Sequence, residues 1–272
     1  MTRVSDRQAS TLNCSDLNWH VHSRAVWSRD GVEAEVFHQD YKGNTVKTLV
    51  VSFPERRRAL STFQGFLEVR HVCNHYAPQE VWEEFKSLDE CWTYLGKLMD
   101  ELGLKDYACV CTAVDMDDLA VAEAEHNGVW FTALATAGTS NALRAGFDRA
   151  EYYEADGEFL EAGTINVILV TNASLTGAAM ARAIVTATEA KCAVLQDLGV
   201  RSSYSPGLLA TGTGTDNVVV VSGEGAKITY TGGHSKAGEM IGEVVYRAVK
   251  GSLEKWLKRK GADNSIGGSI TP

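Results

Sequence analysis

The chain has 272 residues, of which 44% are hydrophobic and 22% charged, with a formal net charge of −9 at pH 7. These values are ordinary for a globular protein. The negative charge argues against nucleic-acid and anionic-membrane partners, because both bind through Lys and Arg. Six cysteines without a C-x-x-C pair argue against a disulfide scaffold and a structural zinc site.

The chain also shows no hydrophobic targeting or spanning segment. No apolar run approaches the roughly 20 residues that cross a bilayer. Residues 1–20 are polar and contain no hydrophobic signal core. We therefore expect a soluble protein in the cytoplasm, with residues 1–16 as a disordered leader because they carry no periodicity.

The N-terminal part is expected to form antiparallel strands. In chain order, these strands are expected at Val21–Trp27, Glu33–His38 and Val46–Phe53, and another extended run follows at Phe63–Tyr76. Asp30-Gly31 and Gly43-Asn44 are turn pairs between the first three. This pattern indicates an antiparallel meander.

The rest of the chain alternates helices and strands. Pro78 opens a helix expected to reach about Gly103, because apolar residues recur there at steps of three and four. Further helices are expected at Met116–Glu123, Leu175–Leu198 and Ala237–Lys258, and another is expected to begin at Ser140-Asn141. Further strands are expected at Tyr107–Val114, Val129–Ala137, Thr164–Thr171, Leu208–Thr211, Asn217–Val221 and Lys227–Tyr230.

No long Pro- or Ser-rich linker divides the chain. We therefore expect a single α/β domain over residues 17–260, with an α+β tendency. A mixed β-sheet flanked by helices would include the N-terminal meander. Residues 261–272, rich in Gly, Ser and Asp, are expected to be a disordered tail. The apolar helix over 237–257 could cover the sheet or form a homo-oligomer interface.

Polar residues gather beside the most hydrophobic strands, which suggests a site because buried polar groups cost free energy unless paired. On the helix over 175–198, Glu189 and Lys191 fall roughly 80° to either side of an apolar face that includes Val185. Each could reach toward whatever packs on that face. Alternatively, both extend into solvent as ordinary boundary residues.

A loop of alternating threonine and glycine, ATGTGTD (210–216), follows that helix. Its backbone N–H groups and hydroxyls could hold a phosphate, an amide carbonyl or an oxyanion. The alternative is a plain β-turn between strands. His234, just before a helix expected to start near Ser235, could act as a general acid or base, or simply bond a neighbour.

Several segments, in the right order, resemble the adenosylcobinamide amidohydrolase family over about residues 60–250. They are GTIN (163–166), TNASLTGAAMARAIVTATEAK (171–191), ATGTGTD (210–216) and GGHSKAGEMIGEVVY (232–246). VCNHYAP (72–78) and TAGTSNALRAG (136–146) are also similar, whereas STFQGFLEV (61–69) departs from the family pattern.

The resemblance implies hydrolysis of the amide between the aminopropanol arm and a propionate side chain of the corrin ring. The products would be adenosylcobyric acid and aminopropanol, a step of corrinoid salvage in cobalamin biosynthesis. The partner would be a small-molecule corrinoid. No cofactor or protein metal site is expected, because the cobalt belongs to the substrate.

Amide hydrolysis needs an activated nucleophile, an oxyanion stabiliser and an acid for the leaving amine. We expect Glu189 to activate water and Lys191 to stabilise the oxyanion or orient Glu189. Asp216 would orient Lys191 or His234, and His234 would protonate the amine. The residues expected to bind the substrate or the oxyanion are Asn74, Ser140, Asn141, Asn172, Thr211, Thr213, Gly214 and Thr215.

Other chemistries remain open from the residues. A covalent route would use Thr171, Thr213 or Ser140 as nucleophile. A metal route would use Asp216, His234 and Glu189 as ligands. The same residues could also serve a non-catalytic corrinoid- or nucleotide-binding protein, or an amidase for a different substrate.

Overall fold

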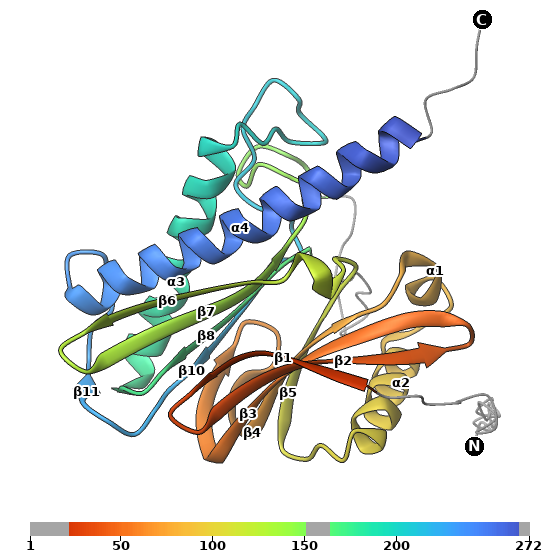
Figure 1. Ribbon diagram of the computed structural model, residues 1–272. Coiled ribbons are helices and arrows are strands. Elements are labelled where there is room, and N and C mark those ends of the chain that lie inside the picture. Colours follow the sequence, from red (N-terminus) through yellow and green to blue (C-terminus); the bar gives the residue numbers. More distant parts are fainter. Residues whose placement is uncertain (1–21, 151–163, 267–272) are drawn as a thin grey trace, which may run out of the picture.

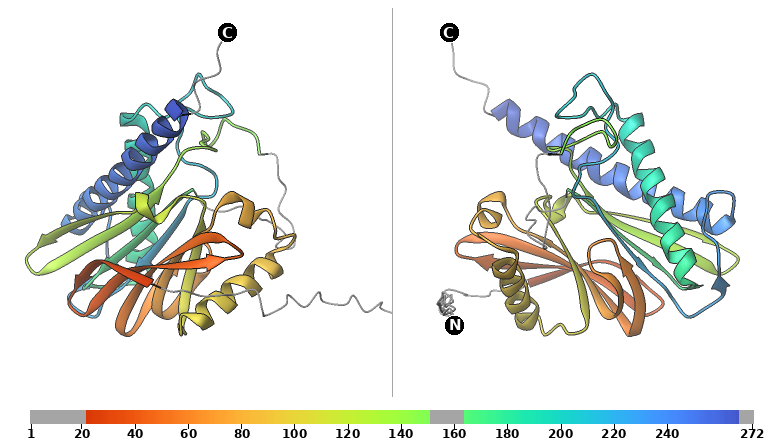
Figure 2. Two further views of the ribbon diagram at one scale, coloured as in Figure 1. Left: turned by 45° about the vertical axis from the view of Figure 1, so that its right-hand side comes forward. Right: turned by 180° about the vertical axis from the view of Figure 1, so that it is seen from behind.

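The computed structural model describes residues 22–150 and 164–266, which form packed layers of helices and a bent sheet (Figures 1 and 2). The strands are β1 (His22–Arg29), β2 (Val32–Tyr41), β3 (Asn44–Ser61), β4 (Gly65–Tyr76), β5 (Tyr107–Thr112), β6 (Ala120–His126), β7 (Val129–Ala137), β8 (Ile165–Thr171), β9 (Ser174–Leu175), β10 (Asn217–Val221) and β11 (Lys227–Ile228). The helices are α1 (Gln79–Trp82), α2 (Leu88–Glu101), α3 (Gly177–Asp197) and α4 (Lys236–Ile266), with a 3-10 turn at Met116–Asp118.

One nine-stranded mixed sheet organises the domain. Its main path runs β1-β2-β3-β10-β8-β7-β6, while β4 pairs with both β3 and β5. The pairs β10–β8 and β4–β5 are parallel, and β1 to β4 form an antiparallel meander. The expected single α/β domain with a mixed sheet, flanking helices and an N-terminal meander is confirmed.

Hydrophobic clusters fill the spaces between these layers. The cluster that includes Leu169 and Ile241 lies between α3 and α4 and the outer face of β7, β8 and β10. A second cluster, with Leu49 and Trp130, lies between the two halves of the bent sheet. A third, with Met99, lies under α2 against β4 and β5. The burial of these apolar faces supplies the main driving force for the arrangement.

Tight turns fix the hairpins. Asp30-Gly31, Lys42-Gly43 and Asn127-Gly128 all have positive φ at both residues. This conformation is the one that two-residue hairpins favour, because its twist matches that of the strands. The second turn lies one residue earlier than the sequence suggested.

The helix expected from Pro78 to Gly103 is instead broken into α1 and α2. Ser87 begins α2, and its Oγ accepts a hydrogen bond from the Glu90 N–H at 3.3 Å. The Glu90 carboxylate accepts in turn from the N–H of Lys86 at 2.8 Å. This exchange resembles a capping box, which starts a new helix. The break turns α1 away from α2 and opens space between them.

The acidic helix expected at Met116–Glu123 is also wrong. After the 3-10 turn, which Asp115 caps, the chain enters strand β6. Pairing with β7 through the Asn127-Gly128 hairpin outweighs any local helical preference of this alanine-rich segment.

Two loops and a helix end differ from expectation. Residues 138–150 form a loop without the helix expected at Ser140-Asn141. The strand expected at Leu208–Thr211 is reduced to one isolated bridge, between Arg201 and Leu209. Helix α4 continues to Ile266, into the expected tail. The expected leader over residues 1–16 lies outside the described residues.

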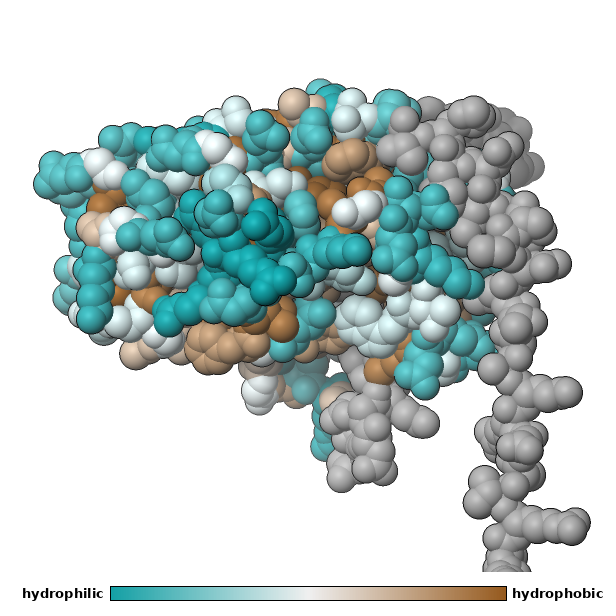
Figure 3. Space-filling model, turned by 90° about the horizontal axis from the view of Figure 1, so that it is seen from below, coloured by the Kyte–Doolittle hydropathy of each residue, from teal (hydrophilic) through white to brown (hydrophobic). Residues whose placement is uncertain are grey.

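The surface is mixed in character. The face seen from below carries a compact hydrophilic area with smaller hydrophobic areas around it (Figure 3). Among the described helices, none is long and apolar enough to cross a bilayer.

Candidate active site

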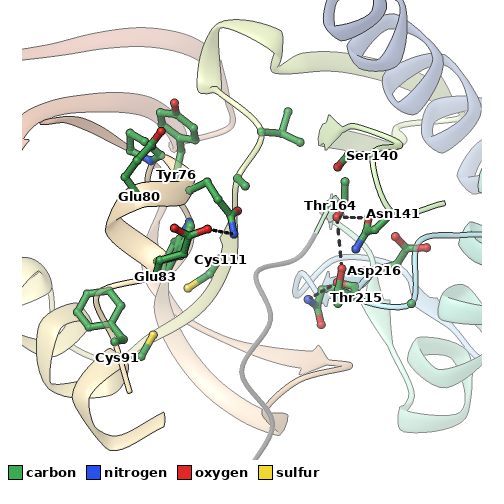
Figure 4. Close-up of a pocket in the computed structure, with 18 of the residues that line it drawn as sticks. Tyr76, Glu80, Glu83, Cys91, Cys111, Ser140, Asn141, Thr164, Thr215 and Asp216 are labelled. Carbon is green, nitrogen blue, oxygen red and sulfur yellow. Dashed lines mark hydrogen bonds between the residues drawn. The ribbon is translucent and has the colours of Figure 1, made fainter. Parts of the chain in front are cut away.

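A cavity of about 950 Å³ lies at one edge of the domain (Figure 4). It is bordered by α1 and α2 on one side and by residues just before β8 and β10 and just after β7 on the other. Its volume is at the upper end of the range for small-molecule sites. Figure 4 shows the two groups of side chains facing each other across it.

The polar wall of this cavity consists of Ser140, Asn141, Thr164, Thr215 and Asp216. Thr164 Oγ1 donates to Asn141 Oδ1 at 2.8 Å and lies 3.4 Å from Thr215 Oγ1. Because the single Thr164 hydroxyl proton is used on Asn141, Thr215 is the donor in the second contact. These hydroxyls and amides can therefore bind the amide groups of a ligand.

Asp216 is held by a buried cation. Its Oδ2 pairs with Nζ of Lys191, and Thr213 donates to Oδ1 through its hydroxyl at 2.5 Å and to Oδ2 through its N–H at 3.2 Å. The Lys191 side chain is 11% exposed and that of Asp216 is 14% exposed. The expected contact between Asp216 and Lys191 is present, and it fixes a carboxylate at the cavity surface.

The buried face of α3 differs from the predicted one. Lys191 lies on the buried face with Ala183, Ala187 and Val194, whereas Val185 is 42% exposed. The apolar lysine stem packs inside while its charge is neutralised by Asp216. Lys191 is therefore not a flanking residue of α3, because it points into the domain.

Two glycines make the threonine–glycine loop possible. A Cβ on Gly212 would lie 2.5 Å from Asp216 Oδ2 and 2.8 Å from Lys191 Nζ. Gly214 has a φ of +81°, and a Cβ there would meet Leu143 at 2.7 Å. Gly212 thus leaves room for the ion pair, and Gly214 allows the left-handed turn.

The opposite side of the cavity is aromatic. We call Phe63, Trp82, Phe85 and Trp92 the aromatic wall. The rings of Phe63 and Trp92 are stacked, with centroids 5.5 Å apart and an interplanar angle of 21°. The side walls of the cavity therefore differ sharply in polarity, which suits a large amphipathic ligand.

Two exposed carboxylates accompany the aromatic wall. Glu80 and Glu83 belong to α1 and its end, and both line the cavity. Glu83 accepts a hydrogen bond from the Gln79 amide at 3.4 Å. Lys260 is the single cationic side chain among the described residues that line the cavity. Because Asp216 is paired with Lys191, the two remaining carboxylates face one ammonium, so the cavity favours a neutral or cationic ligand.

Cys91 and Cys111 also line the cavity. A hydrogen bond to Cys111 and burial raise the pKa of Cys91, and contact with Cys109 raises the pKa of Cys111. Both groups are therefore neutral thiols near pH 7. Because the thiolate is the reactive form, neither is suited to act as a nucleophile.

Asn74, expected to bind substrate, lies behind the cavity. It is 1% exposed, donates to Thr136 Oγ1 at 2.8 Å and accepts from the Asn166 amide at 2.8 Å. Asn166 also donates to the carbonyl of Cys111 at 2.9 Å. This network connects β8 to β4 and β5, and so positions the floor of the cavity without lining it.

Glu189 and His234 are not brought to this cavity. The Glu189 side chain is 61% exposed and lies 3.8 Å from the Arg182 guanidinium. It borders a separate, shallow hollow beside the start of α4. His234 is exposed in the turn before α4. Glu189, expected to activate water, therefore does not share a pocket with the threonine–glycine loop, because it points away from the buried face of α3.

Other candidates have structural partners. Asn172 holds the β6–β7 hairpin, accepting from Trp130 N–H at 3.0 Å and donating to Gly128 O at 2.8 Å. The Thr211 hydroxyl accepts from Ala145 N–H at 2.9 Å. Thr171 donates to the Trp130 carbonyl at 2.6 Å.

Of the possible nucleophiles, Ser140 lines the cavity, while Thr213 donates to Asp216. Among the side chains of residues 22–150 and 164–261, no group of three or more His, Cys, Asp or Glu is arranged to hold a metal ion. The set Asp216, His234 and Glu189 is therefore not assembled.

The sequence interpretation missed the opposite half of the site. Glu80, Glu83, Trp82 and Trp92 were absorbed into a continuous helix, whose apolar positions were assigned to the core. The signal that could have found them is Ser87 with Glu90, a capping box in the middle of that helix. Charged residues on a short separate turn are then free to face a cavity.

Comparisons with known proteins agree with the resemblance of the motifs. Residues 33–261 match the model of the family described as adenosylcobinamide amidohydrolase. An adenosylcobinamide amidohydrolase of Methanosarcina mazei is 36% identical over 154 residues, covering 53% of this chain and 64% of that protein.

An uncharacterized protein of Methanocaldococcus jannaschii is 44% identical over 228 residues, covering 79% of this chain and 88% of that protein. The crystal structure of the PH0078 protein from Pyrococcus horikoshii aligns with a TM-score of 0.39 and 12% identity over 77% of each chain. Since the family model covers most of the chain, including both walls of the cavity, the chain belongs to the adenosylcobinamide amidohydrolase family.

Proposed function

We propose that the protein hydrolyses the amide between the aminopropanol arm and the corrin ring of adenosylcobinamide. Water adds to the amide carbonyl carbon, the C–N bond breaks, and the products are adenosylcobyric acid and aminopropanol. Membership of the family supports the reaction class. The observation that carries the assignment of a site is the cavity with one polar and one aromatic wall.

The charge of the cavity supports a corrinoid ligand. A cobalt(III) corrin with an alkyl upper ligand and no phosphate carries a net positive charge. The carboxylates of Glu80 and Glu83 outnumber the ammonium of Lys260 at the cavity surface, and the charge of Asp216 is compensated by Lys191. The peripheral amides of the corrin match the hydroxyl and amide groups of Thr215 and Asn141.

Asp216 is the group best placed to handle the proton. In our assignment its carboxylate accepts a proton from the attacking water and delivers it to the departing nitrogen. Lys191 and Thr213 act as positioning residues, because they hold the carboxylate in place. Gly214 and Thr215 line the cavity, and Gly214 has a left-handed φ. We assign the oxyanion site to the N–H groups of this turn, since a left-handed residue can direct successive N–H groups toward one side.

The test is turnover of adenosylcobinamide, with adenosylcobyric acid and aminopropanol measured by mass spectrometry. Asp216→Asn keeps the shape of the side chain but removes its basicity, so kcat should fall by about 10²- to 10⁴-fold. Glu189→Gln, on the same helix as Lys191 but outside the cavity, is the matched control and should keep full activity. Binding without product in the wild-type protein would instead identify a corrinoid carrier. Full turnover by a folded Asp216→Asn variant would remove Asp216 from the chemistry.

A further inference from the structure

The aromatic wall presents an open, prearranged stacking surface. Phe63 belongs to the turn between β3 and β4 and is 50% exposed, although its ring stacks on Trp92. Its backbone N–H donates to Ser61 Oγ at 3.1 Å, which fixes the turn. An exposed apolar ring held in place at the mouth of a cavity is suited to contact a ligand.

The groups around this wall indicate the chemistry of that ligand. Flat nitrogenous bases stack on aromatic side chains, whatever their sequence context. Carboxylates accept hydrogen bonds from ribose hydroxyls and from exocyclic amines, and Glu80 and Glu83 line the cavity on the side of Cys91, which belongs to α2 (Figure 4). A phosphate would be repelled there, because the single cation of the described lining, Lys260, is outnumbered. The combination therefore favours a nucleoside without phosphate.

We infer that the aromatic wall, together with Glu80 and Glu83, is a nucleoside subsite that takes the adenine ring and ribose of the 5′-deoxyadenosyl group bound to cobalt. The inference rests on the proposed function for the identity of the nucleoside. Phe63 is the base-stacking residue, and the two glutamates accept from the sugar hydroxyls or the adenine amine. The polar wall is then left for the amide edge of the corrin.

The subsite can be tested with a free nucleoside, independently of turnover. 5′-Deoxyadenosine is titrated into the full-length protein, with binding followed by ligand-observed NMR. Phe63→Ala should weaken binding by about 5- to 150-fold, the range for the loss of one base stack. The matched control is Phe66→Ala on the same hairpin, which is 64% exposed and does not line the cavity. It should leave binding unchanged.

Two further binding measurements distinguish which part of the ligand the subsite recognises. Adenosine 5′-monophosphate should bind more weakly than 5′-deoxyadenosine, and the double variant Glu80→Gln/Glu83→Gln should reduce that difference. Phe63→Ala should also weaken binding of adenosylcobinamide more than that of cyanocobinamide. An equal loss for both corrinoids would place the ring against the corrin and overturn the inference.

Failure of the subsite and failure of the proposed function give different results. No binding of 5′-deoxyadenosine to the wild-type protein, or equal binding to wild type and Phe63→Ala, overturns the subsite even if adenosylcobinamide is hydrolysed. Selective loss of the nucleoside in Phe63→Ala supports the subsite even if no cobyric acid forms, in which case only the proposed reaction fails.

Discussion

Helix α3 carries two ion pairs whose burial differs, and this difference predicts unequal contributions to stability. Lys191 and Asp216 have side chains 11% and 14% exposed, whereas Arg182 and Glu189 are 39% and 61% exposed and 3.8 Å apart. We compare Lys191→Met, which keeps the apolar stem but removes the charge, with Glu189→Gln.

Removing one partner of a fully buried pair costs about 3–5 kcal/mol, because the other charge is left without compensation. Asp216 would keep two hydrogen bonds from Thr213 and some access to solvent, so we expect a loss of about 2–4 kcal/mol for Lys191→Met. Breaking the exposed pair should cost less than about 1 kcal/mol. For a domain of this size, each kcal/mol lowers Tm by about 2–4 °C.

The assay is urea unfolding at pH 7 followed by fluorescence, with thermal unfolding as a second measurement. A double-mutant cycle with Asp216→Asn would isolate the interaction free energy between the two charges, because the double variant lacks both of them. Equal losses of stability for Lys191→Met and Glu189→Gln would refute the argument from burial. A folded Glu189→Gln variant without turnover would return Glu189 to the catalytic machinery.

Two further predictions concern the loop and a buried histidine. Gly212→Ala places a methyl group against Asp216 and Lys191, so the free energy of unfolding in urea should fall by about 1–3 kcal/mol and turnover should be reduced. The control Gly207→Ala, which has nothing within 4 Å of its new methyl group, should change neither quantity. Burial lowers the pKa of His75 to about 3, from about 6.5 when unfolded, so stability is lost as pH falls from 6.5 toward 3. Because of His75, the free energy of unfolding in urea should be about 2–3 kcal/mol lower at pH 4.5 than at pH 7. His75→Gln should make stability less dependent on pH over this range, and an unchanged pH dependence in this variant would contradict the prediction.

The sequence was sufficient for most of the strands and for one wall of the site. The continuous apolar runs of β8 and β10 and the turn pairs of the hairpins have local causes, so they could be predicted locally. The threonine–glycine loop does reach the cavity, with Gly214, Thr215 and Asp216 lining it. These residues were found because small and hydroxylated groups beside buried strands are unusual.

The roles on α3 could not be predicted from its period. Its buried face contains Ala179, Ala183 and Ala187, and alanine marks a face only weakly. The apolar pattern therefore gave the wrong orientation, with Val185 inside. The burial of Lys191 depends on Asp216, which lies 25 residues later in the chain. A local pattern contains no information about such a partner.

The opposite wall depends on tertiary structure in a different way. Strand β3 is 18 residues long and pairs with β2, β4 and β10, so it belongs to both halves of the sheet. Its register with β4 shifts between Ser52 and Arg57, which marks the irregularity where the shared strand passes from one half to the other. Because α1 and α2 follow β4, while the loop with Asp216 leads into β10, this strand sets the distance between the aromatic and polar walls. The cavity is thus a consequence of strand pairing over long sequence separations, and neither wall alone predicts the other.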